Sequence, residues 1–146
     1  MKHLRGFNES LNKEELQDFC ETYLAYLLDD GFNVSIEHRY NNDKKYKIYD
    51  YHFITIKKTS KFKWEEIKDQ FIPFISVLSK EYKLKDRCIT FNGTKYYTYS
   101  DPYTQLGMDD RKYGKEPVSK LYNTKDIITD YINFKYPIEF INIIVQ

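Results

Sequence analysis

Histidine side chains are the first candidates for chemistry in this chain, because paired histidines bind metal ions or exchange protons at neutral pH. His38 and His52 lie on either side of the turn signal Asn41-Asn42-Asp43. A hairpin that turns near residue 43 places these two histidines about four residues out of register, roughly 13 Å apart at ~3.3 Å per residue. His3 lies in the opening segment, away from other ligand types. We therefore predict no metal site.

The cysteines and carboxylates do not suggest a catalytic set either. Cys20 falls on the apolar face of a predicted helix and Cys88 opens a predicted strand, as small buried hydrophobes do in a reducing compartment. The glycine-rich phosphate motifs and the GxSxG nucleophile motif are absent from the sequence. Adjacent carboxylates such as Glu14-Glu15 and Glu65-Glu66 diverge by about 100° on a helix and suit its positive end. We expect a protein that is not an enzyme and that uses no cofactor.

Aromatic residues are the main compositional surplus: 15 Tyr, 10 Phe and 1 Trp in 146 residues. Ala25 is the only alanine and lysine far outnumbers arginine, so an AT-rich genome accounts for much of this surplus. Tyrosine is also enriched at the energetic centres of protein interfaces. Several tyrosines have no role in the predicted core and gather in two predicted hairpins and the segment beside them. With one acidic pair of that segment, they form the predicted interaction surface: Tyr49, Tyr51, Tyr96, Tyr97, Tyr99, Tyr103, Tyr113, Asp109 and Asp110.

Charge gives a weak case for nucleic acid as the partner. The net charge is +1, whereas duplex-binding proteins usually carry a larger basic excess. Residues 40–95 carry 13 positive and 7 negative side chains, which leaves a local basic region. Single-stranded nucleic acid therefore stays an alternative partner, stacked on aromatic strands that carry Tyr49, Tyr51, Tyr97 and Tyr99.

Hydrophobic periodicity predicts the first half of the fold. Asn12 is a good N-cap, and apolar residues at 3–4 spacing predict a helix to Leu28 that stops at Gly31. Alternation predicts a strand over 32–40. Residues 46–57 read as the returning strand, apolar in both phases, which indicates a central strand or a bulge near Asp50. A second helix is expected over 64–81, kinked or split at Pro73.

Turn signals and breakers organise the second half. Asn92-Gly93 predicts a tight hairpin between 88–91 and 94–99. Residues 100–123 are interrupted by proline and glycine and read as irregular. A short third helix capped by Thr124 is expected next, followed by a strand over 138–145. This order favours one α+β domain over 11–146, with an antiparallel sheet of about five strands, two main helices and a short third. Residues 1–10 precede it as a leader.

Three stretches resemble small uncharacterised proteins of large tailed bacteriophages: residues 1–10, residues 19–32 with the run Tyr23-Leu24-Ala25-Tyr26-Leu27-Leu28, and Trp64-Glu65-Glu66-Ile67 with the residues that follow to Phe74. The resemblance implies an AT-rich phage gene whose product is made in the host bacterial cytoplasm. One role that it implies for the leader is docking onto, or packaging within, the phage particle, with Leu4 and Phe7 as the contact residues and the virion as a second location of the protein.

Taken together, these features predict a non-enzymatic bacteriophage protein that acts by protein–protein contact, either in the virion or in its assembly. One alternative is an early phage protein that binds a host factor or a signalling ligand to counter host defence. The other is the single-stranded nucleic-acid binding described above. We expect no membrane partner, because no apolar run approaches the ~20 residues of a membrane helix.

Overall fold

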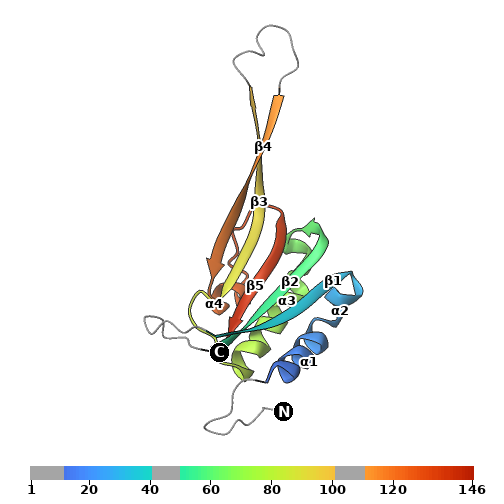
Figure 1. Ribbon diagram of the computed structural model, residues 1–146, viewed down its shortest axis with the longest axis vertical. Coiled ribbons are helices and arrows are strands. Elements are labelled where there is room, and N and C mark those ends of the chain that lie inside the picture. The colour runs from blue at the N-terminus through green and yellow to red at the C-terminus, as the bar shows by residue number, and fades with distance from the viewer. Residues whose placement is uncertain (1–11, 41–49, 101–110) are drawn as a thin grey trace.

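A computed structural model describes residues 12–40, 50–100 and 111–146 of the chain (Figure 1). Within these ranges the chain forms one sheet of five antiparallel strands in the order β1-β2-β5-β3-β4. It also forms four helices, of which α1 and α3 are the longer ones. The predicted single α+β domain is therefore confirmed. In chain order the elements are α1 (Lys13–Tyr23), α2 (Ala25–Asp29), β1 (Phe32–Tyr40), β2 (Asp50–Phe62), α3 (Trp64–Glu81), β3 (Ile89–Ser100), β4 (Arg111–Tyr122), α4 (Thr124–Ile128) and β5 (Ile138–Val145).

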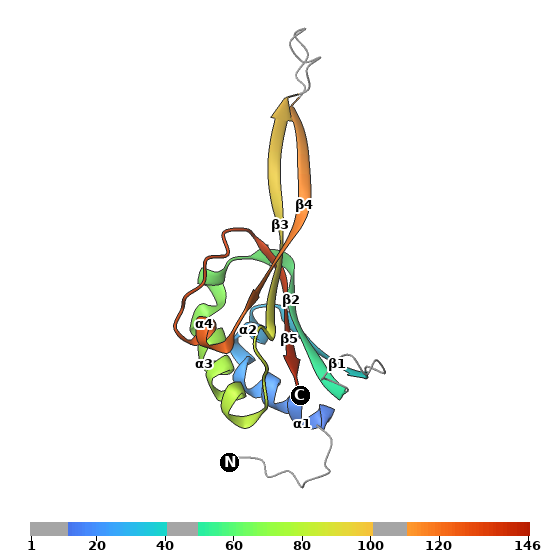
Figure 2. The same ribbon diagram turned by 90° about the vertical axis from the view of Figure 1, so that its left-hand side faces the viewer.

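The domain has two layers, with the helices on one face of the sheet (Figure 2). Alternate residues of the central strands point toward the helices, so Ile54 of β2 and Ile141 of β5 are fully buried. The buried stripe of α3, which includes Phe71 and Phe74, covers them from the other side. None of the described helices lies on the opposite face, which we call the open face.

The first predicted helix forms as two helices. The Asn12 side chain accepts hydrogen bonds from the backbone N–H groups of Glu14 and Glu15, at 2.8 and 3.4 Å, which confirms the predicted cap. The helical path is interrupted at Leu24, whose φ and ψ of −110° and 19° separate α1 from α2. Gly31 then adopts a φ of +91°, the left-handed conformation that ends a helix at little cost only for glycine.

The first hairpin pairs residue for residue from Phe32 opposite Lys58 to Tyr40 opposite Asp50. Because β2 lies between β1 and β5, both of its phases contribute apolar residues, and the central-strand prediction is confirmed. The alternative, a bulge near Asp50, is wrong for the described residues of β2: pairing with β1 is continuous from Asp50 onward, and the register shifts only between Lys57 and Phe62, against β5. Helix α3 runs unbroken through Pro73, so the predicted split is also wrong. Pro73 is exposed, where water can bond the carbonyl that lacks its helical donor.

The Asn92-Gly93 turn prediction is wrong, because β3 continues straight through both residues. A Cβ at position 93 would lie 2.2 Å from the backbone oxygen of Pro137 and 3.0 Å from the ring of Phe134, so glycine is required here by close approach. The segment predicted as irregular contains β4, which pairs with β3 from Tyr122 opposite Ile89 onward. β4 is an edge strand, and this position tolerates Pro117 and explains the missing hydrophobic alternation.

Candidate interaction surface

The outer halves of β3 and β4 project from the domain as a two-stranded ribbon, which we call the arm (residues 94–100 and 111–117; Figures 1 and 2). Pairing between β3 and β5 ends at Gly93, opposite Ile138. Beyond that point the two arm strands pair with each other and with no other described strand. The arm therefore has two backbone edges and stands apart from the helical layer.

Two backbone hydrogen bonds fix the direction of the peptide groups along β3. The carbonyl of Cys88 accepts from the Ile144 N–H at 3.0 Å, and the N–H of Thr94 donates to the Pro137 carbonyl at 3.3 Å. Both bonds point toward β5. Since N–H and C=O groups alternate between the two edges of an antiparallel strand, the even-numbered residues of β3 address the β5 side and the odd-numbered ones address β4.

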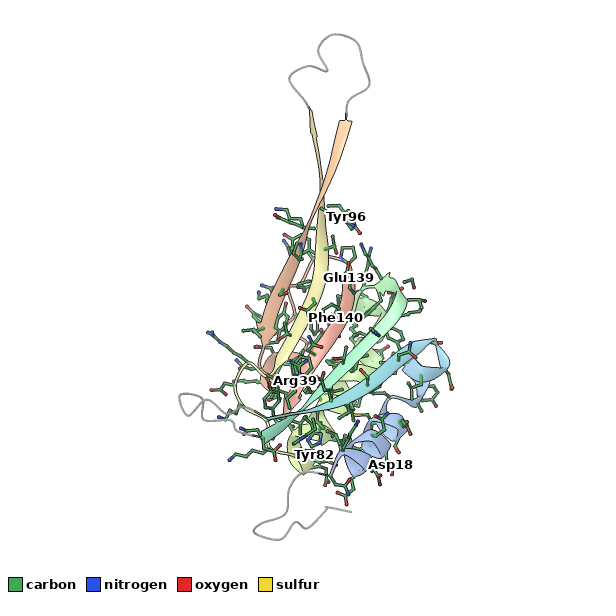
Figure 3. All side chains as sticks on the ribbon, viewed as in Figure 1. Asp18, Arg39, Tyr82, Tyr96, Glu139 and Phe140 are labelled. Atoms are coloured by element: carbon green, nitrogen blue, oxygen red, sulfur yellow. The ribbon has the colours of Figure 1, made fainter. Side chains whose placement is uncertain are left out.

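The base of the arm is tied to the sheet by a small polar cluster (Figure 3). Glu139 is the bulged residue of β5, because Phe140 pairs with Asn92 while Ile138 pairs with Gly93. Its carboxylate accepts a hydrogen bond from Thr94 Oγ1 at 2.5 Å and lies 3.7 Å from Lys61 Nζ. The bulge thus turns a carboxylate toward the arm, as bulges commonly do for one side chain.

The same lysine contacts the first tyrosine of the arm. Lys61 Nζ lies 4.0 Å from the centroid of the Tyr96 ring, an arrangement worth about 0.5–1 kcal/mol at an exposed site. Lys95 and Glu116 pair across the two strands at 3.9 Å. A hollow of about 230 Å³ lies between the arm and the end of the sheet, and it is lined by Lys61, Thr94, Tyr96, Lys115, Glu116, Pro117 and Glu139. These contacts restrain the direction in which the arm leaves the domain.

The arm contains four of the seven tyrosines predicted as a surface. Tyr96 is 54 % exposed. In the backbone register Tyr97 lies opposite Gly114, Tyr99 opposite Lys112, and Tyr113 opposite Thr98. The remaining predicted residues Tyr49, Tyr103, Asp109 and Asp110, and the leader residues Leu4 and Phe7, fall outside the described residues.

Tyr51, the seventh predicted tyrosine, lies at the far end of the sheet from the arm. It sits on β2 opposite Arg39, and its neighbour on the open face is Phe53. The Arg39 guanidinium lies 4.0 Å from the centroid of the Phe53 ring. The structure therefore does not bring Tyr51 together with Tyr97 or Tyr99, the combination that the nucleic-acid alternative assumed.

The open face carries a partly buried apolar group that the sequence did not reveal. Phe140 and Ile144 of β5 are partly exposed there, with Ile144 directly opposite Phe53. A polar pair, Thr55 Oγ1 and Asn142 Oδ1 at 3.0 Å, separates these apolar side chains. Residues 138–145 form an almost continuous apolar run, so alternation alone could not separate the buried residues from those of the open face.

The predicted separation of the histidines is wrong. His38 lies directly opposite His52, and their ring centroids are 5.0 Å apart. His38 Nε2 also forms a hydrogen bond with the Asp50 carboxylate, while His52 is buried. Among the described residues, no three ligand side chains of the His, Cys, Asp or Glu types gather in one place as a metal would require.

Both cysteines are buried, as predicted. Desolvation raises the pKa of the Cys20 thiol to about 12 and that of the Cys88 thiol to about 11. A nucleophilic cysteine needs a thiolate at working pH. These two thiols are protonated at neutral pH and are suited to packing.

A second hollow, of about 340 Å³, lies at the end of the domain opposite the arm, where Figure 3 labels Asp18 and Tyr82. The ring of Phe19 packs between those of Tyr23 and Tyr82, with centroid distances of 4.6 and 5.4 Å. Carboxylates beside aromatic faces attract cationic groups. The full lining is Glu15, Asp18, Phe19, Thr22, Tyr23, Glu81 and Tyr82.

Two further findings bear on what the chain is. No helix in the described ranges has both the length and the apolar character to cross a bilayer. Comparison with protein-family models, curated proteins and solved structures found no match to this chain.

Proposed function

We propose that this protein acts by protein–protein contact and that the arm is its contact element. The observation that carries the proposal is the extension of β3 and β4 beyond the sheet, with three tyrosines on the β3 strand of the arm and Tyr113 on the β4 strand. In line with the resemblance of residues 1–10 and 19–32, we propose a bacteriophage protein that works in the virion or in its assembly.

The physical support is that the arm contributes little to the stability of the domain. A two-stranded ribbon is at best marginally stable in water, because it buries little apolar surface. A two-residue turn after Lys95 would connect β3 to β4 equally well. The chain instead carries a longer ribbon, whose Tyr96 side chain is more than half exposed. Tyrosine gives large contact area at low conformational cost, which suits a binding element.

The test is a short-arm variant in which residues 96–115 are replaced by Asn-Gly. This change joins Lys95 to Glu116, which are a directly opposed pair of β3 and β4. We expect the variant to melt like the full-length chain, yet to lose its partner when both are purified from the natural host cells and compared by quantitative mass spectrometry. Equal recovery of the same partners by both chains would contradict the proposal.

The identity of the partner separates the two protein-contact versions. Recovery of a structural protein of the particle, together with presence of the chain in purified particles, supports the virion version. Recovery of a host factor with absence from the particles supports the early protein that counters host defence.

The open face supports a second candidate function, the binding of single-stranded nucleic acid. Its specific support is the stack of Arg39 on Phe53, on a face that also carries Tyr51 and Phe140. Fluorescence anisotropy with a labelled oligonucleotide at low salt tests it, because the electrostatic contribution is largest there. Absence of binding, or binding unchanged in the Phe53→Ala variant, eliminates this candidate.

A further inference from the structure

The two edges of the arm differ in how well they are protected against pairing with another strand. The even-numbered residues of β3 direct their N–H and C=O groups toward the β5 side, away from β4. The β4 residues that lie directly opposite them therefore direct their own N–H and C=O groups away from β3, to the outer edge of β4. These outward positions of β4 are Arg111, Tyr113, Lys115 and Pro117.

The outward edge of β4 is blunted by its sequence. Pro117 has no N–H to offer, and two further outward positions of β4 are occupied by basic residue types, arginine at 111 and lysine at 115. Proline and lysine on an edge strand are devices that natural proteins use against edge-to-edge pairing. If two copies of β4 paired antiparallel about Tyr113, Arg111 of each would oppose Lys115 of the other, which like charges disfavour.

The outward edge of β3 has no such protection. Beyond the Thr94–Pro137 bond, Tyr96, Thr98 and Ser100 direct their N–H and C=O groups to a side where no described strand pairs with them. Residues 96–100 contain no charge and no proline, and tyrosine and threonine favour strands. Strand β5 pairs with β3 only as far as Ile138, opposite Gly93. A strand added beside residues 96–100 of β3 would therefore extend the sheet in the position that β5 occupies further along.

Resting on the proposed function of the arm, we infer that the β3 edge pairs with the β3 edge of a second copy of this chain. A two-fold axis at Thr98 sets Thr98 opposite Thr98 of the partner subunit and Tyr96 opposite Ser100 of the partner subunit. All of these residues direct both hydrogen-bonding groups toward the axis, so every donor meets an acceptor. The contact is self-complementary, as a two-fold dimer requires, and opposes no like charges within 96–100.

Two proline variants at the same height on the arm test this inference. Thr98→Pro removes an outward N–H from the β3 edge, whereas Tyr113→Pro removes the outward N–H of the residue directly opposite on β4. Neither change removes a hydrogen bond that joins β3 to β4, which makes the second variant a matched control.

The measurement is sedimentation velocity from about 1 to 200 µM protein. We expect the wild-type chain to pass from monomer to dimer in this range. Thr98→Pro weakens dimerisation about tenfold or more and Tyr113→Pro by less than about threefold, since only the first changes the dimer contact. A wild-type chain that stays monomeric, or two variants that are weakened equally, overturns the inference.

The same experiment is separable from the test of the proposed function. A monomeric wild-type chain whose short-arm variant still loses another protein partner ends the inference and leaves the function of the arm standing. Loss of no partner by the short-arm variant contradicts the function, whatever the oligomeric state.

Discussion

Replacement of Gly93 by alanine tests the way in which the arm leaves the sheet. The added Cβ would lie 2.2 Å from the Pro137 oxygen, far inside van der Waals contact, and 3.0 Å from two atoms of the Phe134 ring. The ring can turn, but the carbonyl belongs to the backbone and accepts the Thr94 N–H bond at 3.3 Å. Overpacking together with loss of this bond is expected to lower the free energy of unfolding by about 2–4 kcal/mol.

Urea unfolding followed by circular dichroism measures this change, which corresponds to a fall in Tm of roughly 6–16 °C for a domain of this size. Gly31→Ala is the control: no atom lies within 4 Å of its added Cβ, and the cost comes from its φ of +91° alone. We expect about 1 kcal/mol there.

A Phe134→Ala background separates the two neighbours of Gly93. Because the carbonyl is the obstacle, Gly93→Ala should cost the same in that background as in the wild-type chain. A cost below about 1 kcal/mol would refute the close approach. Full rescue by Phe134→Ala would show that the ring, and not the backbone of residue 137, fills the space.

Three further predictions follow from contacts of the described residues. Glu139→Ala removes the acceptor of the Thr94 hydroxyl and should lower the free energy of unfolding by about 1 kcal/mol, measured by urea unfolding, whereas Glu139→Gln should retain most of it. Asp130→Ala removes the acceptor of Trp64 Nε1 at 2.6 Å and should lower Tm by several degrees in calorimetry, roughly 3–8 °C, with a smaller loss in Asp130→Asn. Burial raises the pKa of Cys20 from 9.0 to about 12, so its contribution to stability is present below pH 9 and is lost as the pH rises toward 12. Unfolding of wild type and Cys20→Ala at a series of alkaline pH values should therefore show a steeper loss in the wild type, and parallel curves would contradict it.

Local signals predicted the fold where local physics decided it. Asn12 and the 3–4 spacing after it located α1, because a cap and an apolar stripe are properties of neighbouring residues. Alternation located β1, whose inner residues such as Ile36 pack against the helical layer. Periodicity could not detect the break at Leu24, since both sides of it keep their apolar residues toward the core.

The failures came from contacts between residues far apart in the chain. Asn92-Gly93 is a strong hairpin signal, yet Gly93 is needed for the approach of Pro137, which lies far along the sequence. The predicted partner of His38 was wrong because the centre of the hairpin was placed two residues too early. A shift of two residues at the centre moves each cross-strand partner by four residues, so His38 pairs with His52 and not with residue 48. In the part of the β4 arm strand whose burial is described, residues 114–117 are partly or fully exposed, so no buried face produces alternation there.

The candidate surface shows the same division. The tyrosine surplus of residues 96–99 was visible in the sequence, but its position on a projecting arm depends on the pairing of β3 with β4. Phe140 stood within an apolar run and was not separable from its buried neighbour Ile141. The bulge that turns Glu139 toward Thr94 had no sequence signal of its own.

Site-specific photo-crosslinking in the natural host cells shows whether the arm is the element through which this protein contacts its partner. A benzophenone amino acid in place of Tyr96 reports contacts of the arm, and the same residue in place of Tyr131, which is 78 % exposed and lies outside the arm, reports chance encounters. We expect a discrete protein adduct from position 96 and none from position 131. No adduct at position 96, or the same adducts at both positions, would contradict the proposed role of the arm.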